Sequence, residues 1–231
     1  MKNEFKDGFI ANIPISFSVF AYGWVLGMLC VNKGIELYEL VLMNVFIFAG
    51  SAQFVMVDMW SSSLDVIGIV LAALMINLRY FLIGASLNPL FINSSKKEKF
   101  KYMHFVTDEC WAITMNRLKT QNITPLFLFG GGICIFSSWF IGTIFGFTLG
   151  EFIKDPSVYA LDFAFVAIFT ALCTNMFKGK EDLIPWLITA LVAIVCEHYI
   201  QGKVYIIVGA LAGSLSAVFL YKKEEEEKVL C

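Results

Sequence analysis

The chain has 231 residues, of which 58% are hydrophobic, 16% aromatic and only 16% charged, and its mean hydropathy is +0.75. So large an apolar share excludes an ordinary soluble domain and indicates an integral membrane protein. The formal net charge of −2 provides no basic field of the kind that binds nucleic acid, so no nucleic-acid partner is expected.

Long apolar runs predict an all-α, polytopic membrane bundle. A helix needs about 20 mainly apolar residues to cross the hydrocarbon layer. Seven stretches meet this criterion: 8–31, 40–60, 64–92, 124–150, 158–177, 182–200 and 203–221. Residues 1–221 are therefore predicted to form a single transmembrane domain, and the acidic residues 222–231 a disordered cytoplasmic tail.

Two of the seven stretches are expected to contain broken helices. The stretch 40–60 holds the small and polar sequence AGSAQ at 49–53, and the stretch 64–92 is too long for one straight span. A broken helix frees backbone groups, which a membrane tolerates only where the segment faces protein or a water-filled cavity.

The segment between the third and fourth stretches is polar. A basic loop, SSKKEKFKYMH at 94–104, precedes FVTDECWAITMNRLKTQN at 105–122, which is amphipathic. The pattern predicts an interfacial or re-entrant helix, or an eighth crossing. With seven spans, the distribution of lysine and arginine favours an N-terminus outside and a C-terminus inside, whereas eight spans would place the N-terminal lysines inside.

The sequence also suggests an inverted repeat of three spans. Spans one to three and four to six share the order of a glycine-rich span, an acidic connector and a phenylalanine-rich span. Two copies with an odd number of spans have opposite orientations and form a site near the midplane between them.

Five segments, in order, resemble the AzlC family, the large subunit of bacterial branched-chain amino acid exporters. They are FKDGFIANIP at 5–14, FAGSAQF at 48–54, INLRYFLIGASLNPLF at 76–91, FVTDE at 105–109 and GEFIKDPSVYALDFAFVAIF at 150–169. The resemblance implies a multi-pass protein of the bacterial inner membrane that exports leucine, isoleucine, valine and similar amino acids, with a small AzlD-like membrane subunit as partner. The chain departs from the family pattern at Tyr80, where histidine is expected, and in its acidic tail.

The AGSAQ sequence is a candidate binding site for the carboxylate of an amino acid. A carboxylate in a membrane needs a cation or the free N–H groups at a helix start. Gly50 and Ala52 allow close approach, and Ser51 and Gln53 add hydrogen-bonding side chains. The alternative is a small-residue packing seam between helices, which leaves Gln53 in need of a partner.

Arg79 and its neighbour Asn77 lie inside the long apolar stretch 64–92. An ionisable side chain there costs roughly 2.5–3.5 kcal/mol on insertion scales, which indicates a functional role. Arg79 is a candidate for holding a substrate carboxylate through two hydrogen bonds. The alternative is a structural ion pair with an acidic residue, and both apply if the substrate carboxylate displaces the protein's own. The candidate partners are Asp108, Glu109 and Asp162.

The same three acids, Asp108, Glu109 and Asp162, are candidates for proton coupling, because an acid in apolar surroundings can exchange a proton near neutral pH. The alternative is an interfacial acid in contact with water. Phe48 and Phe54 flank AGSAQ and are candidates for contact with an apolar side chain.

The sequence contains no GxxxxGK[ST], HExxH or GxSxG motif, and its six cysteines lack CxxC or Cys/His spacing. We therefore expect no enzymatic activity, no cofactor and no metal site. Three functions remain open: a proton-coupled secondary exporter of apolar amino acids, a passive channel for small metabolites, and a structural or accessory subunit of a transport complex. The sequence does not decide the preferred amino acid, the need for a small subunit or the oligomeric state.

Overall fold

The computed structural model describes residues 3–61, 63–152, 166–167, 170–171, 173–174, 177, 179, 182–199 and 204–230. These residues are almost entirely helical and form two compact units. Unit 1 comprises 1–64 and 76–165, and unit 2 comprises 65–75 and 166–231. Helices of unit 1 are α1 (Glu4–Asn32), α2 (Leu37–Phe46), α3 (Gly50–Asp58), α5 (Arg79–Ser86), η1 (Asn88–Phe91), α6 (Lys96–Met103), α7 (Asp108–Leu118) and α8 (Pro125–Gly150).

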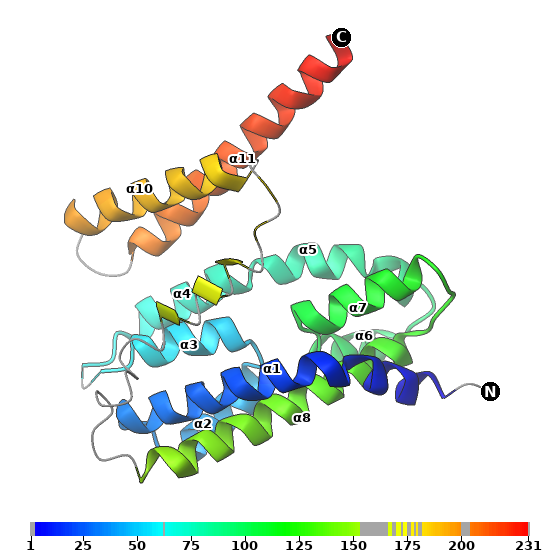
Figure 1. Cartoon of the computed structure of the whole chain (residues 1–231), viewed down its shortest axis with the longest axis vertical. Helices are drawn as coiled ribbons and strands as arrows, with labels where there is room; N and C mark the ends of the chain where they lie inside the picture. Colours follow the sequence, from blue (N-terminus) through cyan, green and yellow to red (C-terminus); the bar gives the residue numbers. More distant parts are fainter. Residues whose placement is uncertain are drawn as a thin grey trace. The chain divides into compact units, whose positions relative to one another are not determined.

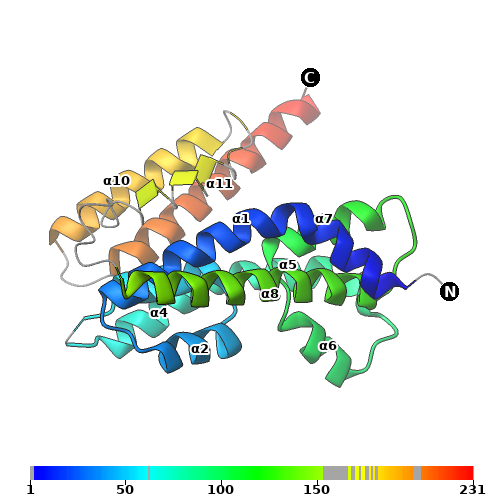
Figure 2. The ribbon, with the colours of Figure 1, turned by 60° about the horizontal axis from the view of Figure 1, so that its bottom comes forward.

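The centre of unit 1 is a pair of long helices, α1 and α8, that lie side by side and run in the same direction (Figures 1 and 2). Glycines bring their backbones into direct contact. A Cβ added to Gly8 would lie 2.0 Å from the carbonyl oxygen of Phe127, and one added to Gly146 would lie 1.9 Å from that of Trp24. Small residues of this kind are what allows membrane helices to approach closely.

Helix α2 and the residues after it approach the middle of α8. Asn44, near the end of α2, donates a hydrogen bond from Nδ2 to Oγ1 of Thr143 at 2.7 Å. Phe48 then packs against Phe136, with ring centroids 5.1 Å apart. From Asn44 to Phe48 the residue numbers rise, whereas those of their partners on α8 fall from Thr143 to Phe136. Helix α2 is therefore antiparallel to α8.

Helix α3 turns back toward the end from which α2 came. Gly50, its first residue, lies against the ring of Trp139. At the other end of α3, the carbonyl oxygen of Asp58 accepts a 2.7 Å hydrogen bond from Nζ of Lys33, which follows α1. Helices α2 and α3 therefore form a hairpin, called hairpin one. Its two ends lie where α1 ends, and its tip is 47–51.

Helices α6 and α7 form a second hairpin, called hairpin two. Lys101 of α6 places Nζ 4.9 Å from the ring centroid of Phe129, and Phe105 at the tip packs on Phe136 at 5.3 Å. Arg117, near the end of α7, then lies 5.8 Å from the ring of Phe127, near the start of α8. Hairpin two thus enters and leaves at the end where α8 begins, and its tip is 104–108.

Capping residues explain where the helices of hairpin two begin. The backbone N–H of Ser95 donates to the carboxylate of Glu98 at 2.8 Å, while Oγ of Ser95 accepts from the N–H of Glu98, so α6 starts with a capping box. Thr107 caps α7 in the same way by accepting from the N–H of Cys110. The amphipathic segment was predicted to hold a helix, and α7 confirms it.

The two hairpins change the expected count of crossings. The stretch 40–60 was predicted to be a span broken at AGSAQ. The break is confirmed, since α2 ends at Phe46 and α3 begins at Gly50, but the single crossing is wrong, because these helices have 10 and 9 residues and double back. Each hairpin returns to the end from which it came. Between α1 and α8 the chain therefore crosses once, through Val66–Ser86, and α1 and α8 run parallel. First spans of an inverted repeat of three spans would have opposite directions, and the structure does not show that arrangement.

Three helices among the described residues are long and apolar enough to cross a membrane: Glu4–Asn32, Val66–Ser86 and Pro125–Gly150. The first contains the predicted stretch 8–31, and the other two fall within the stretches 64–92 and 124–150. Only Leu78 separates α4 (Val66–Asn77) from α5. Most of the predicted span 158–177 lies outside the described residues.

Unit 2 contains residues 66–75 of α4, α10 (Leu183–Tyr199) and α11 (Val204–Leu230). Helices α10 and α11 contact each other through small residues, since a Cβ added to Gly209 would lie 3.0 Å from that of Ala193. The predicted stretches 182–200 and 203–221 are thus helical where the structure describes them, but their apolar parts, Leu183–Tyr199 and Val208–Leu220, are shorter than the three long apolar helices. Helix α11 continues to Leu230 through residues for which the sequence favoured disorder; glutamate and lysine have good helix propensity.

Candidate functional site

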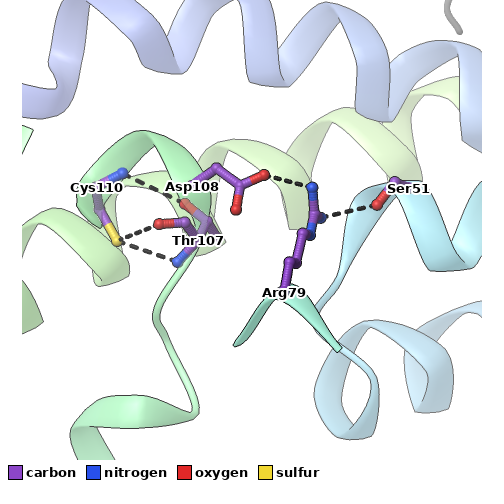
Figure 3. Close-up of polar contacts among 5 residues, drawn as sticks. All are labelled: Ser51, Arg79, Thr107, Asp108 and Cys110. Atoms are coloured by element: carbon purple, nitrogen blue, oxygen red, sulfur yellow. Dashed lines mark hydrogen bonds and ion pairs between the residues drawn. The ribbon is translucent and has the colours of Figure 1, made fainter. Parts of the chain in front are cut away.

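Arg79, the first residue of α5, joins the two hairpins (Figure 3). Its NH2 group donates a hydrogen bond to Oγ of Ser51 on hairpin one at 2.8 Å. Its NH1 group donates to Oδ2 of Asp108 on hairpin two, and the two side chains form an ion pair. Residues that lie 28 and 29 positions away in the sequence are thereby brought together on one guanidinium. Of the three acids proposed as partners for Arg79, Asp108 is the one that forms an ion pair with it among the described residues.

Both partners of Arg79 lie at helix starts. Ser51 is the second residue of α3 and Asp108 is the first residue of α7. Helix α3 has no side-chain cap, so its first N–H groups keep their capacity to bind an anion. Arg79 and the start of α3 thus lie next to each other, joined through Ser51.

The hydrogen-bonding capacity of Arg79 is not exhausted. Its Nε atom is buried without a partner in the described structure, as is Oδ1 of Asn77 two residues earlier. The guanidinium also lies 5.4 Å from the ring centroid of Tyr80, a cation–π contact. The side chains of Arg79 and Asp108 keep 32% and 41% of their surface exposed. The ion pair is therefore only partly buried.

Gln53, by contrast, is fully engaged inside the protein. It is fully buried, donates from Nε2 to Oδ1 of Asn44 at 3.0 Å, and accepts at Oε1 from Nε1 of Trp139 at 2.8 Å. Asn44 in turn donates to Thr143. This buried network fixes hairpin one against α8 and supplies the partner that the packing interpretation of Gln53 lacked.

Gly50 and Ala52 fit the packing interpretation as well. A Cβ on Gly50 would lie 2.9 Å from the ring of Trp139, and Ala52 is fully buried. Of the four candidates in AGSAQ, the structure therefore brings Ser51 to Arg79, places Gly50 and Gln53 against Trp139 of α8, and buries Ala52.

The two candidate phenylalanines are buried but have different neighbours. Phe48, 7% exposed, packs on Phe136, whereas Phe54, 2% exposed, packs on Trp139 with ring centroids 6.2 Å apart. Phe48 thus lies at the tip of hairpin one, three residues before Ser51, and Phe54 lies with the buried network.

Two further acids were predicted to carry protons. Glu109 follows Asp108 in the first turn of α7 and is partly buried. Asp162 lies outside the described residues. Within the part of the chain that the structure describes, no group of three or more histidine, cysteine or acidic residues could hold a metal ion.

The sequence interpretation missed residues of α8 and α2. Trp139 and Phe136 resemble any aromatic residue of an apolar helix, and nothing local in the sequence marks them. Asn44 and Thr143 are polar residues within apolar runs. Their burial cost was a usable signal, because a polar group in a membrane needs an internal partner.

A helical body with three helices, among the described residues, that are long and apolar enough to cross a membrane is typical of an integral membrane protein. A family model described as AzlC protein matches residues 14–153, which include both hairpins and Arg79. The chain belongs to the AzlC family, as the resemblance of its motifs predicted.

Individual relatives agree with this assignment. The inner membrane protein YgaZ of Escherichia coli K12 is 27% identical over 93% of this chain and 89% of its own length. The branched-chain amino acid transport protein AzlC of Bacillus subtilis 168 is 23% identical over 96% of this chain and 87% of its own. An uncharacterized membrane protein of Helicobacter pylori 26695 is 26% identical over 96% of both chains. No solved structure matches.

Proposed function

We propose that the chain is a secondary transporter that exports branched-chain or other apolar amino acids, and that it binds the substrate carboxylate at Arg79. The observation that carries this proposal is the position of Arg79 between Ser51 of hairpin one and Asp108 of hairpin two. The name of the Bacillus relative, a branched-chain amino acid transport protein, supports the substrate class.

The substrate carboxylate takes the place of Asp108 on the guanidinium. Asp108 contacts one nitrogen of Arg79 in the structure, whereas a free carboxylate can bind two nitrogens of a guanidinium side by side. Ser51 and the uncapped start of α3 remain available to hold it. The exchange replaces one ion pair by another, so the partly buried guanidinium of Arg79 keeps a partner throughout.

Transport is proposed to be coupled to protons, and the candidates for the proton path are Asp108, Glu109 and Asp162. Among them, Asp108 is the acid that the substrate carboxylate displaces from Arg79.

The membrane orientation follows from the hairpins. The end of unit 1 where α1 and α8 begin carries Lys6, the basic residues of hairpin two and Lys119, whereas the opposite end carries Lys33. Lysine and arginine concentrate on the cytoplasmic side. We therefore place the N-terminus in the cytoplasm, which replaces the outside N-terminus expected from seven spans.

Transport in vesicles tests the proposal. Purified protein in liposomes, with and without a co-expressed small AzlD-like subunit, should transport leucine saturably, and the rate should collapse when the proton gradient is removed. Arg79→Gln should abolish transport while folded protein remains in the membrane. Non-saturable flux would indicate a channel, and unchanged transport in Arg79→Gln would refute the assigned site.

A further inference from the structure

We propose that Phe136 forms the subsite for the apolar side chain of the substrate. In this structure, Phe105 and Asp108 at the tip of hairpin two occupy the places that the substrate's side chain and carboxylate take. This inference rests on the proposed function and adds to it the residues that recognise the apolar part of the substrate.

Phe136 lies where the tips of the two hairpins meet. Its ring centroid is 5.1 Å from that of Phe48 and 5.3 Å from that of Phe105, with interplanar angles of 78° and 88°. Both contacts have the edge-to-face geometry that aromatic pairs favour. One ring of α8 thus receives one aromatic side chain from each hairpin.

The two tips present the same pair of groups. Phe48 precedes Ser51 by three residues, and Phe105 precedes Asp108 by three. Each tip therefore offers a ring to Phe136 and an oxygen to Arg79. Three residues reach at most roughly 10 Å, so the polar and the apolar contact of each tip are close enough for one bound amino acid to connect them.

The substrate replaces the contacts of hairpin two and not those of hairpin one. Its tip supplies a carboxylate and an aromatic ring, the two features of an apolar amino acid other than the amine. Hairpin one supplies a hydroxyl, and the fully buried network of Gln53 and Asn44 fixes it to α8. Phe105, Asp108 and Phe136 are partly exposed, so the contacts of hairpin two are the ones that a solute can replace.

The inference predicts opposite effects for the two members of one ring pair. Phe105→Ala removes the internal competitor and should tighten leucine binding, whereas Phe136→Ala removes the subsite and should weaken it. An aromatic pair contributes about 0.5–1.5 kcal/mol beyond its buried area, so each change should be about twofold to tenfold in Kd. Phe136→Ala should also reduce the preference for leucine over alanine.

The measurement is isothermal titration of the purified full chain in detergent with leucine and with alanine. Phe145→Ala is the matched control, because Phe145 is on the same helix but packs on Phe20 and Trp24 at 6.0 and 5.1 Å. Asp108→Asn should tighten leucine binding for the same reason as Phe105→Ala. If Phe105→Ala does not fold, Phe105→Leu takes its place.

Each outcome decides one question. Opposite changes in Kd for the Phe105 and Phe136 variants, with Phe145→Ala near the wild type, support the inference. Weaker binding in both variants, or an unchanged leucine preference in Phe136→Ala, overturns it. If the wild-type chain itself binds no apolar amino acid, the proposed function fails as well, so the two failures are distinguishable.

Discussion

Trp139→Phe tests whether the buried network fixes hairpin one. Nε1 of Trp139 donates to Oε1 of Gln53 at 2.8 Å and lies 3.1 Å from Oδ1 of Asn44. Without the indole N–H, Oδ1 of Asn44 still accepts from Nε2 of Gln53 at 3.0 Å, but Oε1 of Gln53 loses the donor shown here. A buried acceptor without a partner costs about 1–3 kcal/mol.

A second variant isolates this cost. Gln53→Leu alone in the Trp139→Phe background would take the last donor from Oδ1 of Asn44, so Gln53 and Asn44 are both replaced by leucine. The combined variant removes both buried acceptors, and replacing all partners by apolar groups is often nearly neutral. It should therefore be more stable than Trp139→Phe alone, with a coupling free energy on the order of 1–2 kcal/mol.

Thermal unfolding of the purified variants in detergent, followed by tryptophan-independent light scattering and by loss of the monodisperse peak, measures the cycle. A loss of about 2 kcal/mol corresponds to roughly 4–8 °C for a chain of this size. Strictly additive effects of Trp139→Phe and of the paired replacement of Gln53 and Asn44 would show that the network does not act as a unit. Loss of leucine transport in a stable combined variant would instead return Gln53 to the list of substrate contacts.

The remaining predictions concern packing, charge and orientation. Gly146→Ala should prevent stable folding, because its Cβ would lie 1.9 Å from the carbonyl oxygen of Trp24, whereas Gly84→Ala, with 3.7 Å to its nearest neighbour, should be tolerated; yield and thermal unfolding compare the two. Arg79→Lys keeps the charge but loses the planar fork, so leucine transport should fall at least tenfold while expression is unchanged. A reporter that is active only in the cytoplasm should be active when fused to the N-terminus, and an inactive fusion would contradict the orientation drawn from the hairpins.

The sequence predicted the polar centre of the site better than its surroundings. Arg79, Ser51 and Asp108 were identified because charged and hydroxyl groups inside apolar stretches are costly and need a reason. Gln53 was assigned to the same site, yet in the structure its side chain bonds to Asn44 and Trp139 instead. Its partner Trp139 is more than 80 residues away, and no local sequence pattern predicts such a pairing.

The hairpins show where sequence periodicity stops being informative. Two short helices joined at 47–49 have together the length and hydropathy of one crossing. A window of about 20 residues therefore cannot distinguish a hairpin from a single span. The parallel direction of α1 and α8 separates the two arrangements, and it depends on contacts between distant glycines. The count of crossings, and with it the side on which the N-terminus lies, was therefore beyond the reach of local patterns.

The glycine contacts between α1 and α8 also determine which parts can move. A Cβ at Gly27 would lie 2.1 Å from the carbonyl oxygen of Thr143, so the two backbones touch with no flexible side chain between them. Sliding or tilting one helix would break these contacts along the whole pair at once. The pair is therefore a stationary frame, and we expect any transport cycle to proceed by motion of the shorter helices against it.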